Sequence, residues 1–258
     1  MEEVNLTKKE RRTWAKEEKK KEASRNLTYD RLKKLLIVAF GVFILVFAGF
    51  KTLRWITTPT PEIAGVGVEV QETDWVEGKM SAPISLIEYS DFQCPACATY
   101  SPLVKKLLQE YPENLKVVYR HFPLVSIHKN ALPAAKAAEA AGKQGKFWEM
   151  HDILFERQDD WTNEGNPKEK FIKYAKELEL GEDIFLTDYE SGEVEDKVKS
   201  HLNLSNQLGL NATPTFFING ERVRNLGGYE TLQSLIEEEL KKVSILNKLE
   251  FAIANESF

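Results

Sequence analysis

The sequence has 258 residues, which is typical of one or two domains, and its hydrophobic fraction of 42% is enough for a sizeable core. The formal net charge of −5 is unevenly distributed, because the first 34 residues hold 12 Lys and Arg against 7 Asp and Glu. That segment therefore carries a net charge of +5 and the remainder −10. Because the remainder, which would contain the folded part, is acidic, the charge argues against nucleic-acid binding by it.

The N-terminal segment predicts a membrane anchor. Residues 1–34 are polar and densely charged, as in a cytoplasmic tail that builds no core. No charge occurs from Leu35 to Phe50, and Trp55 suits the membrane interface, so residues 35–56 are predicted to form a single transmembrane signal-anchor helix. A cleaved signal peptide is the alternative, although the long segment before it and the lack of an A-x-A site disfavour it.

The positive-inside rule places the N-terminus in the cytoplasm and the rest of the chain outside it. We therefore expect a single-pass protein of the cell membrane whose folded domain is extracytoplasmic or periplasmic, where disulfides persist. Residues 57–74 contain Pro and Gly spacers and predict a linker. The folded domain is expected at residues 75–245, followed by a C-terminal tail at 246–258.

The only two cysteines, Cys94 and Cys97, enclose the dipeptide Pro-Ala in a C-x-x-C motif. Residues 83–89 before the motif predict a buried strand, and residues 99–108 after it have helical spacing. The motif is therefore expected where a strand passes into a helix. The unpaired N–H groups and the dipole of a helix N-terminus stabilise a thiolate, which predicts a nucleophilic Cys94 and a more buried Cys97.

Two structural thiols, or half of a zinc site, are the alternatives to a redox pair. A zinc site needs a second pair of ligands, but there are no further cysteines and the histidines lack the H-x3–5-H spacing. We therefore expect no metal. His121 and His128 are predicted to be packing or surface residues, and His151 a hydrogen-bonded core residue.

Downstream of the motif the pattern predicts, in order, a strand at 115–122, a helical block at 128–208, a strand at 216–218, a return strand at 221–224 and an amphipathic helix through 232–243. The dipeptide Asn219-Gly220 is a strong signal for a two-residue hairpin turn between the last two strands. Residues beyond about Leu249 are ambiguous and are interpreted as a frayed tail.

This order of elements resembles the thioredoxin fold in its DsbA-like form, over roughly residues 75–245. The resemblance rests on the C-x-x-C motif, on Gln-Gly-Lys-Phe-Trp-Glu-Met-His at 144–151 and on Ala-Thr-Pro-Thr-Phe-Phe-Ile-Asn-Gly at 212–220. It implies an α/β thioredoxin-like fold with a helical insertion at about 128–208, preceded by the single N-terminal transmembrane helix.

The resemblance also implies roles for individual residues. Cys94 would be the attacking thiolate and Cys97 the resolving thiol. Glu88 occupies the position of the family's buried acid, where a raised pKa would let it pass a proton to or from Cys97. The alternative is that Glu88 points to solvent at the end of its strand.

Four positions are implied to contact a substrate polypeptide. Pro214 would be the family's cis-proline, which leaves the backbone of Thr213 free to pair with a bound substrate strand. Pro95 and Ala96 lie between the cysteines. Ala96 departs from the best-known oxidant of the family, which has histidine there, so we expect a less depressed pKa for Cys94 and a less oxidising potential.

The sequence therefore predicts a membrane-anchored, extracytoplasmic thiol–disulfide oxidoreductase that acts on cysteine-containing secreted or membrane proteins. An oxidase is preferred because the helical insertion resembles the oxidising branch, with a reductase or isomerase as the alternative. The redox-active Cys94–Cys97 disulfide would need no metal or organic cofactor, but a membrane redox partner would have to reset it. A peptide-binding, chaperone-like module or a Cu(I)-binding module is the alternative of another class.

Overall fold

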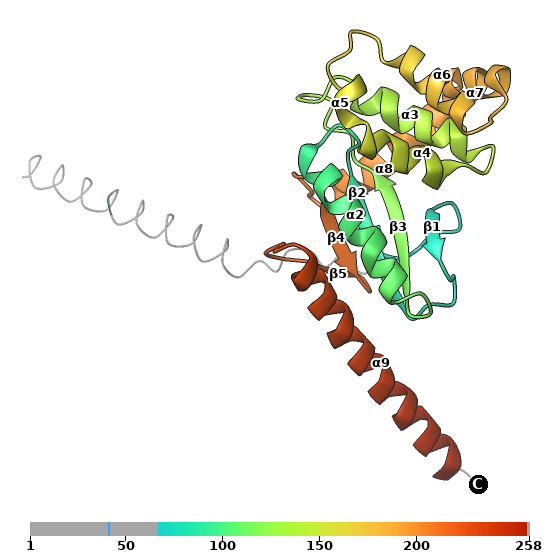
Figure 1. The fold of residues 1–258 in the computed structure, drawn as a ribbon. Helices are drawn as coiled ribbons and strands as arrows, with labels where there is room; N and C mark the ends of the chain where they lie inside the picture. The colour runs from blue at the N-terminus through green and yellow to red at the C-terminus, as the bar shows by residue number, and fades with distance from the viewer. Residues whose placement is uncertain (1–40, 42–66, 257–258) are drawn as a thin grey trace, which may run out of the picture. The chain divides into compact units, whose positions relative to one another are not determined.

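The computed structural model describes residue 41 and residues 67–256 (Figure 1). The predicted tail at 1–34, the predicted transmembrane helix at 35–56 and most of the predicted linker lie outside the described residues. Among the described residues, no helix has both the length and the hydropathy that a membrane span requires.

The described domain is built on a five-stranded sheet with the order β1-β3-β2-β4-β5. Its strands are β1 Trp75–Gly78, β2 Ile84–Ser90, β3 Leu115–His121, β4 Thr215–Ile218 and β5 Glu221–Arg222. The central strands β2 and β3 are parallel, with Glu88 opposite Tyr119 in register. The pairs β1–β3, β2–β4 and β4–β5 are antiparallel. β2 is buried on both faces because it lies in the middle of the sheet.

The predicted hairpin after β4 is confirmed. Asn219 and Gly220 both have positive φ, 47° and 86°, which is the backbone that a two-residue primed turn requires. The Asn219 side chain also accepts a hydrogen bond from the backbone N–H of Ser85, at 2.9 Å, and so fixes the turn to the neighbouring strand. The return strand β5 is shorter than the predicted 221–224.

The helices are α2 Pro95–Glu110, α3 Ala131–Gly142, α4 Phe147–Glu156, α5 Gln158–Trp161, α6 Lys168–Glu177, α7 Glu182–Glu190, α8 Gly192–Gln207 and α9 Tyr229–Glu256. α2 and α9 cover one face of the sheet, where Leu107 and Ile236 pack against Leu86. α8 covers the other face through Leu202 and Leu204. Helices α3 to α8 lie between β3 and β4 and form the predicted helical insertion at about 128–208 (Figure 1).

The insertion packs onto the sheet through small residues. Alanines on α3 bring that helix close to its neighbours, and Gly142 at its end lies directly under the ring of Trp75. A Cβ on Gly142 would come within 2.4 Å of that indole, so no larger residue fits there without a shift. Trp75 in turn stacks on Phe147 of α4, with ring centroids 4.6 Å apart. Strand β1 and the insertion therefore support each other.

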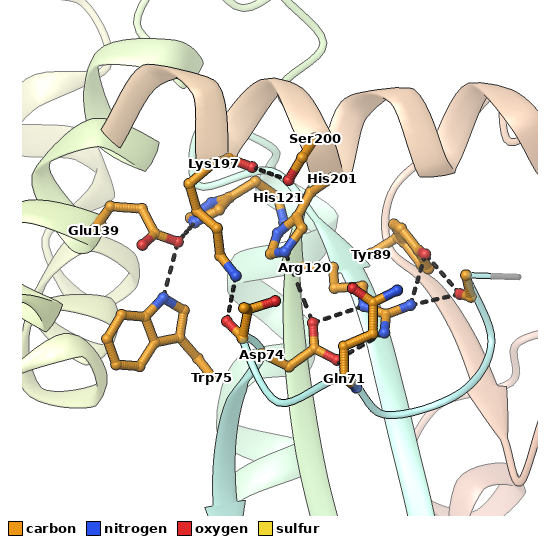
Figure 2. A network of polar contacts seen from close by, with 12 residues as sticks. Gln71, Asp74, Trp75, Tyr89, Arg120, His121, Glu139, Lys197, Ser200 and His201 are labelled. Atoms are coloured by element: carbon orange, nitrogen blue, oxygen red, sulfur yellow. Dashed lines mark hydrogen bonds and ion pairs between the residues drawn. The ribbon is translucent and has the colours of Figure 1, made fainter. Parts of the chain in front are cut away.

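The end of the predicted linker belongs to the packed domain. Asp74 forms a two-pronged ion pair with Arg120 of β3, with Nε–Oδ1 at 3.0 Å and Nη2–Oδ2 at 2.7 Å, and both side chains are fully buried (Figure 2). The Arg120 guanidinium also donates to the carbonyl of Gly67 at 2.6 Å and to the Tyr89 hydroxyl at 2.9 Å. Residues 67–74 are therefore fixed against the central strands.

The C-terminal end differs from the expected tail. Helix α9 continues without a break to Glu256, well past the amphipathic stretch at 232–243 that packs on the sheet (Figure 1). Ile245, Leu246 and Leu249 on the continuation are each more than half exposed. Lys, Glu, Leu and Ala make up 7 of the 13 residues from 244 to 256, and their high helix propensity favours continuation of the helix.

Candidate functional site

The two cysteines lie where the sequence predicts them. Cys94 is the N-cap of α2, with extended backbone angles (φ −77°, ψ 122°), and Pro95 occupies the first helical position. Proline fits there because the first helical N–H has no partner inside the helix. Cys97 lies one turn further along and is completely buried, whereas Cys94 is 8% exposed. Pro95 and Ala96 are exposed beside Cys94.

The environment of Cys94 favours its thiolate. The pKa of Cys94 is lowered to about 5, first because the Cys97 thiol donates a hydrogen bond to it, and further through Thr213 and the backbone N–H groups of Cys97 and Ala96. These donors outweigh the desolvation that would raise the pKa. The contribution of the backbone N–H groups is the one expected at a helix N-terminus.

Cys97 has the opposite character. Burial raises its pKa well above the ordinary thiol value, and the neighbouring Cys94 and Glu88 raise it further because they disfavour a second negative charge. Both thiols are free in the structure. The site therefore pairs an ionised, accessible sulfur with a protonated, enclosed one.

Glu88 is buried, so the alternative that it points to solvent is wrong. It is 2% exposed, and its Oε1 has no hydrogen-bond partner among the described residues. Desolvation by burial raises its pKa to about 7, with a further rise from the charge of Cys94. At neutral pH this carboxyl can therefore either give or accept a proton near Cys97.

The Thr213–Pro214 segment lies against Cys94. The peptide bond between the two residues is cis, as the resemblance implies. The Cys94 sulfur lies 3.5 Å from the carbonyl oxygen of Thr213, and only the protonated thiol could donate a hydrogen bond to it. Both residues are partly exposed, next to the exposed pair Pro95 and Ala96. The four predicted substrate-contacting positions thus surround the accessible sulfur.

Asp91 is a residue of this site that the sequence analysis missed. It follows β2 directly, is 1% exposed and holds the loop that leads to Cys94. One carboxylate oxygen accepts from the backbone N–H of Gln93 at 2.7 Å. The other accepts from the N–H of Leu124 at 2.9 Å and contacts His128 Nδ1 at 2.7 Å. An aspartate directly after a buried strand and before C-x-x-C could have been the signal.

Two amide side chains tie the helical insertion to the active-site loop. Gln158 of α5 donates to the carbonyl oxygens of Phe92 and Cys94, at 2.7 and 3.0 Å. Gln93 donates to the carbonyl of Thr162 at 3.0 Å and accepts from the N–H of Asn130 at 2.7 Å. Because these bonds are satisfied inside the fold, they hold the backbone of Cys94 in place.

The histidines take part in packing and hydrogen bonds. No group of three or more His, Cys, Asp or Glu suited to a metal ion occurs among the described residues. His121 is buried and contacts Glu139 Oε1 at 2.8 Å, while its backbone N–H donates to His201 Nδ1 at 3.2 Å (Figure 2). His151 is a hydrogen-bonded core residue as predicted, with Nδ1 3.1 Å from Asp152 Oδ1. His128 contacts Asp91, three residues before Cys94.

Comparisons with known proteins agree with this geometry. A family model described as Thioredoxin matches residues 70–238, about two thirds of the chain. Among solved structures, BdbD from Bacillus subtilis is 26% identical with a TM-score of 0.58, covering 64% of this chain and 92% of that one. Wolbachia pipientis alpha-DsbA1 is 23% identical with a TM-score of 0.61, covering 68% and 95%, and shows likeness of fold alone. The predicted thioredoxin-like fold with a DsbA-like helical insertion is confirmed.

One of the similar proteins is named as an ion antiporter. The Na(+)/H(+) antiporter NhaA 1 of Mycolicibacterium gilvum is 36% identical over 201 residues, which cover 74% of this chain but only 30% of the antiporter. The chain therefore spans less than a third of the length of this curated relative.

Proposed function

The chain belongs to the thioredoxin family, and we propose that it is a thiol–disulfide oxidoreductase that acts through Cys94 and Cys97, with oxidation of substrate thiols as its direction. The observation that carries this proposal is the contrast between the two sulfurs. Cys94 has a pKa of about 5 at the end of a helix, whereas Cys97 is fully buried with a raised pKa. A good leaving thiolate and a buried resolving thiol are what disulfide exchange requires.

In the oxidising direction the enzyme begins with a Cys94–Cys97 disulfide. A substrate thiolate attacks Cys94 Sγ, the bond to Cys97 breaks, and the proton of Glu88 neutralises the departing Cys97 thiolate. A second substrate thiolate then attacks the substrate sulfur of the mixed disulfide, and Cys94 leaves as a stable thiolate. The substrate is oxidised by two electrons, and the enzyme dithiol carries them to a redox partner.

The substrate is proposed to bind beside Cys94, where Pro95, Ala96, Thr213 and Pro214 are at least partly exposed. The backbone of Thr213 would pair with an extended substrate segment, as in β-strand addition. The substrates would be cysteine-containing secreted or membrane proteins. No metal or organic cofactor would take part, because the disulfide itself carries the electrons.

The location is also a proposal. The uncharged run from Leu35 to Phe50 and the basic residues before it support a single-pass cell-membrane protein with a cytoplasmic N-terminus. The catalytic domain would then be extracytoplasmic, and a membrane redox protein would re-oxidise the dithiol. A reductase of the same fold is the second candidate, because the side chain of Ala96 supplies no donor to the thiolate.

The test uses the full chain and a reduced, unfolded protein substrate in a glutathione buffer. Catalysed disulfide formation is expected for the parent and should fall to the uncatalysed rate in Cys94→Ser. Cys97→Ser cannot form the Cys94–Cys97 disulfide, so it should also lose catalysed disulfide formation, although its Cys94 can still form a mixed disulfide with glutathione. A Cys94→Ser variant that keeps catalysing the exchange would show that the proposal is wrong.

A further inference from the structure

A narrow cleft leads from the surface to Glu88 on the side of the sheet covered by α2. Its volume is about 280 Å³, part of which is open solvent, and its lining includes Glu77 of β1, Lys105 of α2 and both His151 and Asp152 of α4. Glu88, which is buried, also lines it. Since that carboxyl is 2% exposed and its Oε1 has no partner among the described residues, the cleft offers it a route toward solvent.

His151 occupies an aromatic enclosure on this route. Its ring centroid lies 5.0 to 5.6 Å from those of Phe92, Tyr119, Trp148 and Phe155. Its side chain is 8% exposed, so the ring has little freedom to turn. Packing of the helical insertion does not by itself require a polar ring at position 151, since phenylalanine would also fill this space.

The hydrogen bond of His151 sets its tautomer. Nδ1 lies 3.1 Å from Asp152 Oδ1, and the other oxygen of Asp152 is paired with Lys105. A carboxylate can only accept, so Nδ1 carries the hydrogen and Nε2 keeps its lone pair. Burial lowers the pKa of His151, which keeps the ring neutral at pH 7 and able to accept a proton briefly.

The charges around this ring come from every element that packs against it. They are Glu77 of β1, Glu88 of β2, Tyr119 and His121 of β3, Lys105 of α2 and Asp152 of α4. Lys105 and Asp152 neutralise each other at the outer end. Glu88 is the buried carboxyl of the lining, and it is the group that gains and loses a proton in the proposed reaction.

We propose that His151, oriented by Asp152, is the relay through which Glu88 exchanges its proton with solvent along this cleft. The inference rests on the proposed function, in which Glu88 gives its proton to Cys97 when the Cys94–Cys97 bond breaks. Glu88 is then a carboxylate. It regains a proton from Cys97 when the pair is re-oxidised, or from solvent while the protein stays reduced, and in the second case it must return that proton to solvent before it can accept the one on Cys97. A proton enters from solvent, is held at Nε2 of His151 and passes on to Glu88, so that no net charge accumulates at the relay.

His151 is thus a positioning residue that acts through Glu88, and the test must separate relay from packing. In the reduced full chain without substrate, a pH jump is followed by the infrared band of the Glu88 carboxylic acid, assigned with Glu88→Gln. We expect His151→Gln to slow the protonation on the order of tenfold to a hundredfold, as when a positioned acid–base group is lost. Added imidazole should restore the rate, and the titration midpoint of Glu88 should stay unchanged.

Asp152→Asn and Glu149→Gln form a matched pair on the same helix. Each replaces a carboxylate that pairs with a lysine, but only Asp152 lines the cleft. We expect slowed protonation in Asp152→Asn and the parental rate in Glu149→Gln. If His151→Gln does not fold, Asp152→Asn still decides the question, because it leaves the ring in place and removes only its anchor.

Protonation within twofold of the parent rate in both cleft variants would overturn the relay. So would a slowing that imidazole does not relieve and that comes with a displaced Glu88 midpoint, because that pattern indicates altered packing. The measurement is made without substrate. A chain that relays protons through His151 but oxidises no dithiol would therefore refute the proposed function alone.

Discussion

Removing the Cys97 thiol should raise the pKa of Cys94 in the reduced protein, because the hydrogen bond from Cys97 is the largest of the contributions that lower it to about 5. Cys97→Ala removes the donor, whereas Cys97→Ser keeps a hydroxyl at the same place. A hydrogen bond to a charged group contributes roughly 1.5–3 kcal/mol, and one pKa unit corresponds to about 1.4 kcal/mol. The midpoint should therefore lie near 5 in the serine variant and at roughly 6 to 7 in the alanine variant.

The rate of alkylation at a single pH cannot test this. With a pKa of about 5, Cys94 is almost wholly ionised at pH 7, whereas an ordinary thiol of pKa about 8.5 is ionised to about 3%. That gain of roughly thirtyfold is offset by the lower intrinsic nucleophilicity of a low-pKa thiolate, which falls with a Brønsted coefficient of about 0.4–0.5. The shape of the pH profile is what separates the two cases.

Alkylation by iodoacetamide, followed by mass spectrometry, gives that profile, and the ultraviolet absorbance of the thiolate gives an independent midpoint. The parent and Cys97→Ser should react at a constant rate above about pH 6 and about tenfold more slowly at about pH 4. Cys97→Ala should reach its plateau at a higher pH. A parent rate that still climbs between about pH 7 and 8, or identical midpoints in the two variants, would refute the assignment.

Other consequences concern stability. The lowered pKa of Cys94 stabilises the reduced fold by about 2.7 kcal/mol at pH 7. This contribution is greatest above the thiol pKa of the unfolded chain and is lost as the pH falls through 5. The unfolding free energies of the reduced parent and of Cys94→Ser, measured in urea, should therefore converge near pH 4. The raised pKa of Glu88 has the opposite sign, because it destabilises the fold at high pH. Glu88→Gln should therefore raise the unfolding free energy by up to about 3 kcal/mol above pH 7 and change little below about pH 4.5. A gain of the same size at all pH values would contradict a buried titrating carboxyl. Asp74→Asn leaves the buried charge of Arg120 unpaired and should destabilise by about 3–5 kcal/mol, whereas Glu110→Gln, which removes an exposed ion pair, should lose less than about 0.5 kcal/mol in the same assay.

The parts of the fold that the sequence predicts well are those whose cause is local. The buried strand before the motif, the helix that begins at Pro95 and the Asn219-Gly220 turn each follow from hydrophobic period or from special backbone needs. Cys94 falls at the helix end because both neighbouring patterns agree on the boundary. The position of Glu88 is predicted from the family resemblance, and its burial follows from the two strands that flank β2.

The parts that it does not predict depend on distant partners. Strand β1 has only four residues, and it forms because Trp75 pairs opposite Tyr119 and stacks on Phe147 of the insertion. The local sequence of β1 does not predict either contact. Asp74 and Arg120 are residue types normally exposed, and only their mutual pairing permits full burial. The cleft between Glu88 and His151 joins elements more than sixty residues apart in sequence, so no spacing rule could place them together.

The direction of electron flow follows from how the Cys94 thiolate is stabilised. Ala96 provides no charge and contributes only its backbone N–H, whereas the largest contribution that lowers the pKa of Cys94 comes from the Cys97 side chain. The resulting pKa of about 5 lies between the values of about 7 in thioredoxin and 3.5 in DsbA, whose potentials are about −270 and −120 mV. Relative to thioredoxin, a pKa lower by about 2 stabilises the thiolate about a hundredfold, and at about 30 mV for each tenfold step this raises the expected reduction potential from about −270 to about −210 mV. Linear interpolation of potential against pKa between the two proteins gives about −180 mV.

A potential in that range still oxidises structural cysteine pairs. Such pairs have potentials below about −300 mV, so a gap of about 90–120 mV corresponds to an equilibrium of roughly a thousandfold to ten-thousandfold in favour of the substrate disulfide. Equilibration of the full chain with glutathione measures the value directly. The oxidising direction stands if it lies above about −220 mV, whereas a value near −250 mV or below would make the chain a reductant that receives its electrons from the membrane partner.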